Sequence, residues 1–222
     1  NLGTVLENNT LTTLLLFRFS TGFFLAGIYP VGMKIAADYF EKGLGKSLGF
    51  LVGALVLGTS FPHLLSGFDT MLNWKTVLFI TSFLAALGGC LMLFFVPNGP
   101  FRKSSQGLDL SMIFKVFRDK NFRSPAFGYF GHMWELYTFW AFLPIMISSY
   151  NAFNPNTNLN VSFYSFGIIA VGGLACVIGG YLAERFGAKK TAVMALTLSF
   201  LCCLISPIFL SINSPYLFVG FL

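Results

Sequence analysis

The sequence predicts an all-α membrane protein with six complete transmembrane helices and the start of a seventh. Two observations predict this class. Apolar residues make up 55% of the 222 residues and charged residues only 10%, whereas soluble domains carry roughly 25% charged residues. The apolar residues also gather into runs long enough to cross a bilayer, where lipid-facing positions favour apolar side chains.

A helix of about 20 mostly apolar residues crosses the hydrocarbon core. Six segments meet this requirement: 11–37, 44–67, 74–96, 126–149, 163–183 and 191–212. A seventh apolar segment opens at Pro215. The chain starts in a polar stretch without an initiator Met or a signal-peptide pattern and stops inside an apolar run, so we expect a fragment of a longer protein.

Basic residues indicate which loops face the cytoplasm. Lys and Arg concentrate at or next to the segments 39–43, 97–125 and 184–190, which together account for 12 of the 14: Lys34, Lys42, Lys46, Arg102, Lys103, Lys115, Arg118, Lys120, Arg123, Arg185, Lys189 and Lys190. By the positive-inside rule these segments are cytoplasmic, and the first span runs from outside to inside. The net charge of +6 therefore needs no nucleic-acid partner. We expect a multi-pass protein of the cell (inner or plasma) membrane.

The long segment 97–125 contains four apolar residues that share one helical face, namely Leu110, Ile113, Phe114 and Phe117. This pattern is typical of a short amphipathic helix on the inner membrane surface. A solvated linker is the alternative.

The four cysteines all fall inside apolar runs: Cys90, Cys176, Cys202 and Cys203. They lack the spacing of metal ligands, so we interpret them as packing residues. We expect no metal and no cofactor.

One segment carries a family resemblance. Gly180, Leu182, Glu184, Arg185 and Gly187, followed by Lys189 and Lys190, resemble the G-x-L-A-D-R-x-G-R-R loop motif of the major facilitator superfamily. Glu184 stands where the motif has Asp, and Ala188 replaces the first basic residue of the closing pair. The resemblance implies a gating role for this loop as a cytoplasmic latch. A purely topological role for its basic residues is the alternative.

The resemblance also implies a register. In that superfamily the motif follows the second and eighth of twelve spans, and a long cytoplasmic linker separates spans six and seven. The first span here then corresponds to span four, and the chain is part of a twelve-helix bundle. Residues 1–96 would complete the N-terminal six-helix half, 97–125 would form the linker, and 126–222 would begin the C-terminal half.

Further segments add to this resemblance. Arg18 and Gly22 match the R-x-x-x-G motif of span four. Residues 26–38 and 128–137 are similar to uncharacterised bacterial members, some labelled nitrate/nitrite-type porters. The antiporter motif of span five is incomplete, because Pro62-His63 and Ser66-Gly67 replace its Gly-Pro and Gly-Gly pairs. This departure favours uptake or exchange over drug–proton antiport.

Ionisable residues inside a span are functional candidates, since each costs at least about 2.5–3.5 kcal/mol to insert. Glu135 lies near the middle of its span, and His132 lies one helical turn away on the same face. Together they form a candidate proton-binding pair. A structural hydrogen-bonded pair that ties helices together is the alternative.

Three further residues complete the candidate site. Arg18 lies about two turns from the outer end of its span and is suited to an anionic substrate or to neutralising Glu135. Snorkelling to the interface is its alternative. Trp134 and Tyr137 flank Glu135 and are candidates for lining a cavity, although aromatic residues in spans also pack or face lipid.

These features predict a secondary active transporter, not an enzyme, that moves a small solute by alternating access in symport with protons. The partners would be a small molecule or ion (an anion is favoured by Arg18), protons and the lipid bilayer, and we expect a monomer. A non-transporting sensor or scaffold on the same fold is the main alternative. A membrane-embedded enzyme is a further one, although the sequence offers no paired catalytic residues.

Overall fold

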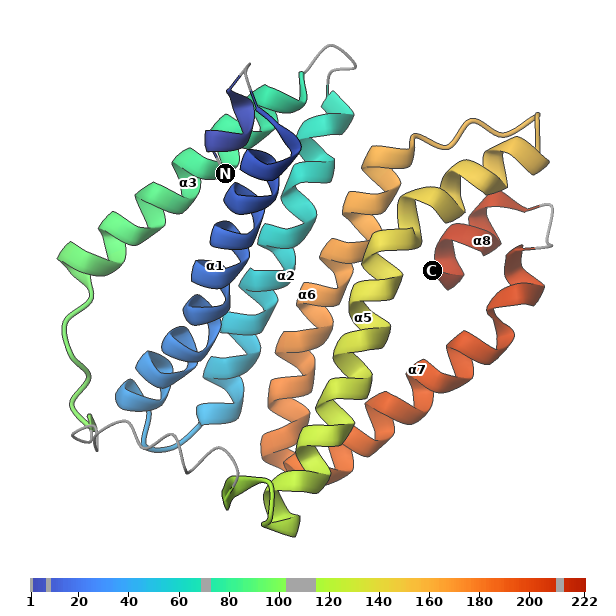
Figure 1. Cartoon of the computed structure of the whole chain (residues 1–222). Helices are drawn as coiled ribbons and strands as arrows, with labels where there is room; N and C mark the ends of the chain where they lie inside the picture. Colours follow the sequence, from blue (N-terminus) through green and yellow to red (C-terminus); the bar gives the residue numbers. More distant parts are fainter. Residues whose placement is uncertain (1, 7–8, 69–72, 103–114, 211–213) are drawn as a thin grey trace. The chain divides into compact units, whose positions relative to one another are not determined.

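The computed structural model describes residues 2–6, 9–68, 73–102, 115–210 and 214–222. Within these residues the chain is helical, without a strand (Figure 1). After a short 3-10 turn, η1 (Leu2–Val5), the helices are α1 (Leu11–Tyr39), α2 (Leu44–Phe68), α3 (Trp74–Phe95), α5 (Lys120–Phe153), α6 (Val161–Phe186), α7 (Ala188–Leu210) and α8 (Pro215–Phe221). The predicted all-α class, with six long helices and a short seventh, is confirmed.

Five of these helices are long and apolar enough to cross a membrane: α1, α2, α3, α6 and α7. Helix α5 is the exception among the six long ones, and its middle carries the polar side chains of His132 and Glu135. Its 34 residues correspond to about 51 Å at 1.5 Å per residue. This length exceeds the roughly 30 Å hydrocarbon core, so α5 extends past the apolar segment 126–149 at both ends.

Local capping explains where several helices start. The Thr10 side chain accepts a hydrogen bond from the Thr13 N–H at the start of α1, and Asn73 accepts one from the Lys75 N–H at the start of α3. Both residues lie directly before predicted span starts. At α5, Asp119 accepts from the Asn121 N–H at 2.9 Å. This cap starts the helix before Pro125, so the predicted linker boundary at 125 falls inside α5.

Most of the predicted amphipathic helix lies outside the described residues, including Leu110, Ile113 and Phe114. Phe117 is described, and its ring packs against Phe122 and Phe130 with centroid distances of 5.4 and 6.5 Å. The apolar residue of this group nearest to α5 in the sequence therefore contacts the first part of that helix.

Contacts divide the chain into two compact units. The first unit comprises residues 1–102 and 162–191, and the second comprises 103–161 and 192–222. In the first unit η1 contacts α1 and α3, and α2 contacts α1 and α3. These units are not the two halves predicted on either side of 97–125, which are the halves of a twelve-helix bundle. That division stays a prediction.

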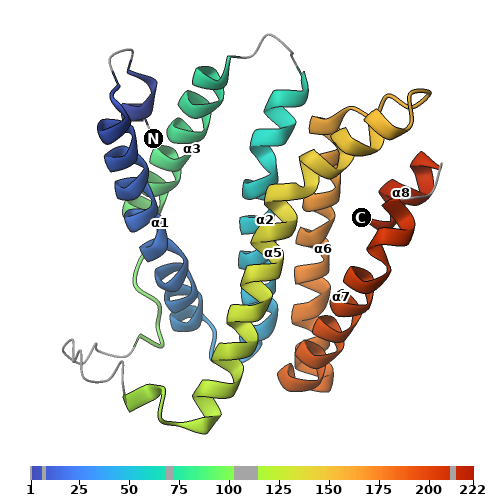
Figure 2. The ribbon, with the colours of Figure 1, turned by 45° about the vertical axis from the view of Figure 1, so that its right-hand side comes forward.

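In the first unit, α2 and α6 run side by side (Figures 1 and 2), and they approach closely at glycines. A Cβ atom on Gly49 would lie 2.9 Å from the Cys176 carbonyl oxygen, and one on Gly180 would lie 2.7 Å from that of Gly45. Only residues without a side chain permit this backbone-to-backbone contact.

The second unit is anchored at one end of α5. The rings of Tyr150 and Phe218 stack in parallel with centroids 4.1 Å apart, and both residues are buried. The Asn151 side chain donates to the Leu159 carbonyl at 2.8 Å and accepts from the Leu159 N–H at 3.1 Å. These contacts fix the segment after α5 and the middle of α8 to the end of α5.

Candidate functional site

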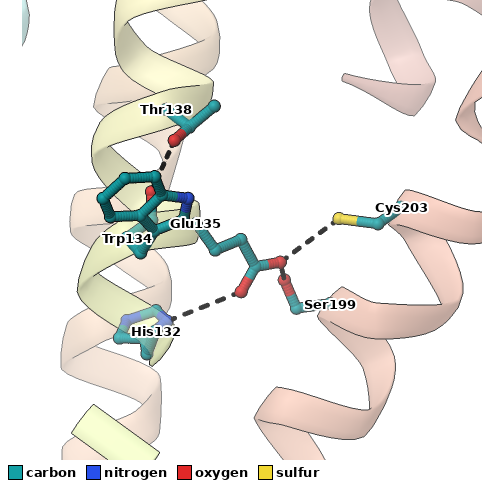
Figure 3. Close-up of polar contacts among 6 residues, drawn as sticks. All are labelled: His132, Trp134, Glu135, Thr138, Ser199 and Cys203. Carbon is teal, nitrogen blue, oxygen red and sulfur yellow. Dashed lines mark hydrogen bonds and ion pairs between the residues drawn. The ribbon is translucent and has the colours of Figure 1, made fainter. Parts of the chain in front are cut away.

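Glu135 is the centre of a polar cluster between α5 and α7 in the second unit (Figure 3). Its Oε1 atom accepts hydrogen bonds from the Ser199 hydroxyl and from the Cys203 thiol, the latter at 3.3 Å. Its Oε2 atom lies 3.9 Å from Nδ1 of His132. Three side chains from two helices therefore meet at the Glu135 carboxyl group.

Helical spacing brings these residues together in pairs. His132 and Glu135 are three residues apart on α5, and Ser199 and Cys203 are four apart on α7, so each pair occupies one helix face. The structure thus brings together the two residues predicted to bind a proton. It also adds Ser199, which the sequence does not single out, and Cys203, whose interpretation as a packing residue omits its hydrogen bond to Glu135. Their four-residue spacing inside an apolar span was the available signal.

His132 has a buried Nδ1 atom without a hydrogen-bond partner among the described residues. The 3.9 Å separation from Glu135 exceeds the range of a hydrogen bond. A protonated imidazole at this distance would form an ion pair with the carboxylate. The two groups are therefore close enough for an ion pair when the imidazole is protonated, but they do not form a hydrogen bond with each other.

The aromatic residues beside Glu135 are largely exposed in this chain. Trp134 is 81% exposed and Tyr137 is 60% exposed. The Tyr137 ring packs edge-on against Trp140 at 5.6 Å, and the Trp134 carbonyl accepts a hydrogen bond from the Thr138 hydroxyl (Figure 3). Cavity lining by Trp134 and Tyr137 stays a prediction.

Arg18 lies on α1 in the first unit, and its side chain is exposed. Glu135 belongs to the second unit. The predicted roles of Arg18, which are binding an anion and neutralising Glu135, both stay predictions.

A second polar site joins the start of α2 to the end of α6 in the first unit. The Glu184 Oε1 atom accepts a hydrogen bond from the Lys46 backbone N–H at 3.2 Å, and Oε2 lies 3.1 Å from the Lys46 ammonium. The same ammonium lies 5.0 Å from the centroid of the Tyr181 ring. We call this group, Lys46, Tyr181 and Glu184, the Lys46–Glu184 clasp.

Glu184 acts in the clasp as a helix cap supplied by another helix. Lys46 is the third residue of α2, where a backbone N–H has no acceptor within its own helix. The partial positive charge of the helix N-terminus favours a carboxylate at this place. An acidic residue at position 184 therefore holds α6 to α2 by three interactions: a backbone hydrogen bond, an ion pair and the helix dipole.

Gly187 makes the turn between α6 and α7 by itself. Helix α6 continues to Phe186 and α7 begins at Ala188, so the predicted loop 184–190 is wrong as a loop and is a one-residue break between two helices. Gly187 has φ +90°, a left-handed conformation that favours glycine. Its N–H donates to the Ala183 carbonyl at 3.0 Å, which closes α6.

The basic residues of the same motif lie around this turn. The Arg185 guanidinium lies 5.3 Å from the Phe186 ring centroid. Lys189 and Lys190 are exposed in the first turn of α7, where the helix dipole disfavours positive charge. The topological and gating roles of these two residues stay predictions.

Comparison with known proteins agrees with this helical architecture. The family model described as Major Facilitator Superfamily matches residues 2–222. The "Ascochitine biosynthesis cluster MFS transporter" of Didymella fabae is 34% identical over 89 residues, which cover 39% of this chain and 17% of that protein. No solved structure matches the chain. Because the family match extends over almost all residues, the chain belongs to the Major Facilitator Superfamily.

Proposed function

We propose that this chain is part of a secondary active transporter that moves a small solute by alternating access and couples the movement to protons through Glu135. Membership of the superfamily supports the transporter class. The observation that carries the coupling is the position of Glu135. Its carboxyl group lies at the middle of α5, partly buried, with polar partners from α7 and an imidazole nearby.

Glu135 has the properties that a proton carrier needs in this proposal. An ionised carboxylate is costly inside a membrane unless donors stabilise it, and the Ser199 hydroxyl and Cys203 thiol supply two donors. A protonated carboxyl group is neutral, so its exposure to the low-dielectric membrane interior during the transport cycle costs less free energy. The imidazole of His132 lies 3.9 Å from this carboxyl group, and in this proposal it exchanges the proton with one side of the membrane.

The Lys46–Glu184 clasp is the proposed latch of the cycle. It closes the cytoplasmic end of α2 against α6, and the glycine contact of the same two helices continues the closure toward the membrane centre. Opening this side to the cytoplasm would require the clasp to release. The turn between α6 and α7 would then stay on the cytoplasmic side because of the positive charges of Arg185, Lys189 and Lys190.

Arg18 and the incomplete antiporter motif support uptake of an anion in symport with protons. The name of the Didymella fabae relative supports a second candidate, in which the solute is a product of a biosynthetic pathway. A non-transporting sensor on the same fold is the alternative outside transport, and solute flux separates it from both candidates.

A thermal-stability panel on the full-length protein in detergent tests the anion proposal. Nitrate, acetate and phosphate would be compared with neutral sugars at about pH 5.5 and pH 7.5, because a ligand that binds the folded state raises its apparent stability. We expect a pH-dependent rise with one anion, and we expect Glu135→Gln and Arg18→Gln each to abolish it. A rise in stability that survives both substitutions, or a rise with neutral solutes alone, would contradict the assignment of the anion site to these residues.

A further inference from the structure

Two donors from α7 converge on a single oxygen of Glu135. Oε1 receives both the Ser199 hydroxyl and the Cys203 thiol, whereas Oε2 faces the His132 imidazole of α5 itself (Figure 3). The two oxygens of the carboxyl group thus have different partners. Oε1 binds the neighbouring helix, and Oε2 faces His132, the group suited to deliver a proton.

The two donors respond differently to the charge of the carboxyl group. A hydroxyl donates to a carboxylate and also accepts from, or donates to, a carboxylic acid, whereas a thiol is a weak donor and a weak acceptor. Hydrogen bonds to an ionised acceptor are roughly twice as strong as neutral ones. When Glu135 takes up a proton, each contact therefore loses roughly half of its strength, and the thiol contact, which is weak already, is left as the weaker of the two.

We propose that Ser199 and Cys203 are positioning residues through which α7 responds to proton loading on Glu135. The thiol contact holds α7 to α5 while Glu135 is ionised, and protonation releases α7 at the level of Cys203 with Ser199 as the remaining link. This inference rests on the proposed function, in which Glu135 is the proton carrier. The titratable groups that face Glu135 in the described part of the second unit are His132 on α5 and Cys203 on α7, with Cys202 next to it in the chain.

Cys202 supplies a matched control on the same helix. It adjoins Cys203 in the sequence but points about 100° away around the helix axis. Both cysteines are exposed. A change that alters the whole of α7 will affect both thiols, whereas a change in the Glu135 contact will affect Cys203 alone.

The test measures alkylation of the two thiols by N-ethylmaleimide in the full-length protein in lipid nanodiscs. Two backgrounds keep one cysteine each, Cys203 or Cys202, with the other cysteines of the protein replaced by Ala. The thiolate sulfur bonds to one alkene carbon of the maleimide and the other carbon takes up a proton. The thiolate is the reactive form, and a neighbouring negative charge disfavours it.

We expect Glu135→Gln to accelerate alkylation of Cys203 by about tenfold, which corresponds to about 1.4 kcal/mol, while the Cys202 rate changes less than about twofold. Ser199→Ala leaves the thiol as the remaining α7 donor to Oε1 and should slow Cys203. Ser199→Thr, which keeps the hydroxyl, should restore the rate. The Ser199 pair keeps the test decisive even when Glu135→Gln does not fold.

Unchanged Cys203 rates in Glu135→Gln and Ser199→Ala, or equal changes at Cys202, would overturn the inference. Its failure is distinguishable from that of the proposed function. A protein whose Cys203 responds to Glu135 but whose proton flux does not depend on Glu135 keeps the contact and refutes the coupling. The opposite pattern refutes the role of α7 alone.

Discussion

Gly53→Ala in α2 would place a methyl group in a close part of the contact with α6. The added Cβ would lie 2.8 Å from the Gly173 carbonyl oxygen and 3.4 Å from Cγ2 of Val177. The first of these contacts is with backbone, which cannot rotate away as a side chain can. The two helices would therefore have to separate by several tenths of an ångström along this part of α2.

The expected free-energy change combines two effects of opposite sign. Replacing Gly by Ala inside a helix gains about 0.5–1 kcal/mol, and overpacking a close contact costs about 1–3 kcal/mol. Gly53→Ala should therefore weaken the closed α2–α6 contact by up to about 2.5 kcal/mol, and the middle of this range, about 1 kcal/mol, is a factor of about 5 in the equilibrium. Gly58→Ala on the same helix should lack the penalty, since its Cβ would meet no heavy atom of another described element within 4 Å.

Apparent melting temperatures of the full-length protein in detergent measure this difference. A change of 1 kcal/mol shifts the melting temperature of a chain of 150–250 residues by about 2–4 °C, and it shifts that of a longer chain by less, because the unfolding entropy grows with length. We expect Gly53→Ala to melt below the unmodified protein and Gly58→Ala to melt at or above it. Equal melting temperatures for the two variants would refute the close contact between α2 and α6.

Three further substitutions test other contacts by the same melting measurement. Glu184→Gln keeps an oxygen that accepts from the Lys46 N–H and should destabilise less than Glu184→Ala, which removes cap and charge together; identical effects would contradict the capping role. Gly187→Ala forces a side chain into a left-handed conformation at φ +90° and should cost about 1–2 kcal/mol, so an unchanged melting temperature would count against the one-residue turn. Asn151→Ala removes both hydrogen bonds to the Leu159 backbone and should cost about 1–3 kcal/mol, whereas a neutral effect would show that this segment needs no such tie.

The helices were predictable from the sequence because spanning a bilayer requires a long apolar run, and such runs stand out in composition alone. Helix ends were less predictable. The start of α5 depends on the Asp119 cap, and the α6–α7 break is reduced to Gly187 because that residue adopts a left-handed conformation. Both features depend on the local backbone conformation, which cannot be read from hydropathy.

The candidate site was predictable only within one helix. His132 and Glu135 lie one turn apart, so their proximity follows from helical geometry. Ser199 and Cys203 lie 64 and 68 residues from Glu135 in the chain, and only tertiary packing brings them near. Glycines show the same limit, since Gly53 and Gly58 look alike in sequence yet only Gly53 contacts α6 closely.

Proton movement coupled to solute movement tests the central claim most directly. The full-length protein would be reconstituted in liposomes that contain a pH-sensitive dye, and the solute that stabilises it in the thermal panel would be added outside. We predict that the unmodified protein moves protons with the solute, and that Glu135→Gln moves no protons but still exchanges labelled for unlabelled solute across the membrane. Solute-dependent proton movement of undiminished rate in Glu135→Gln would contradict the account.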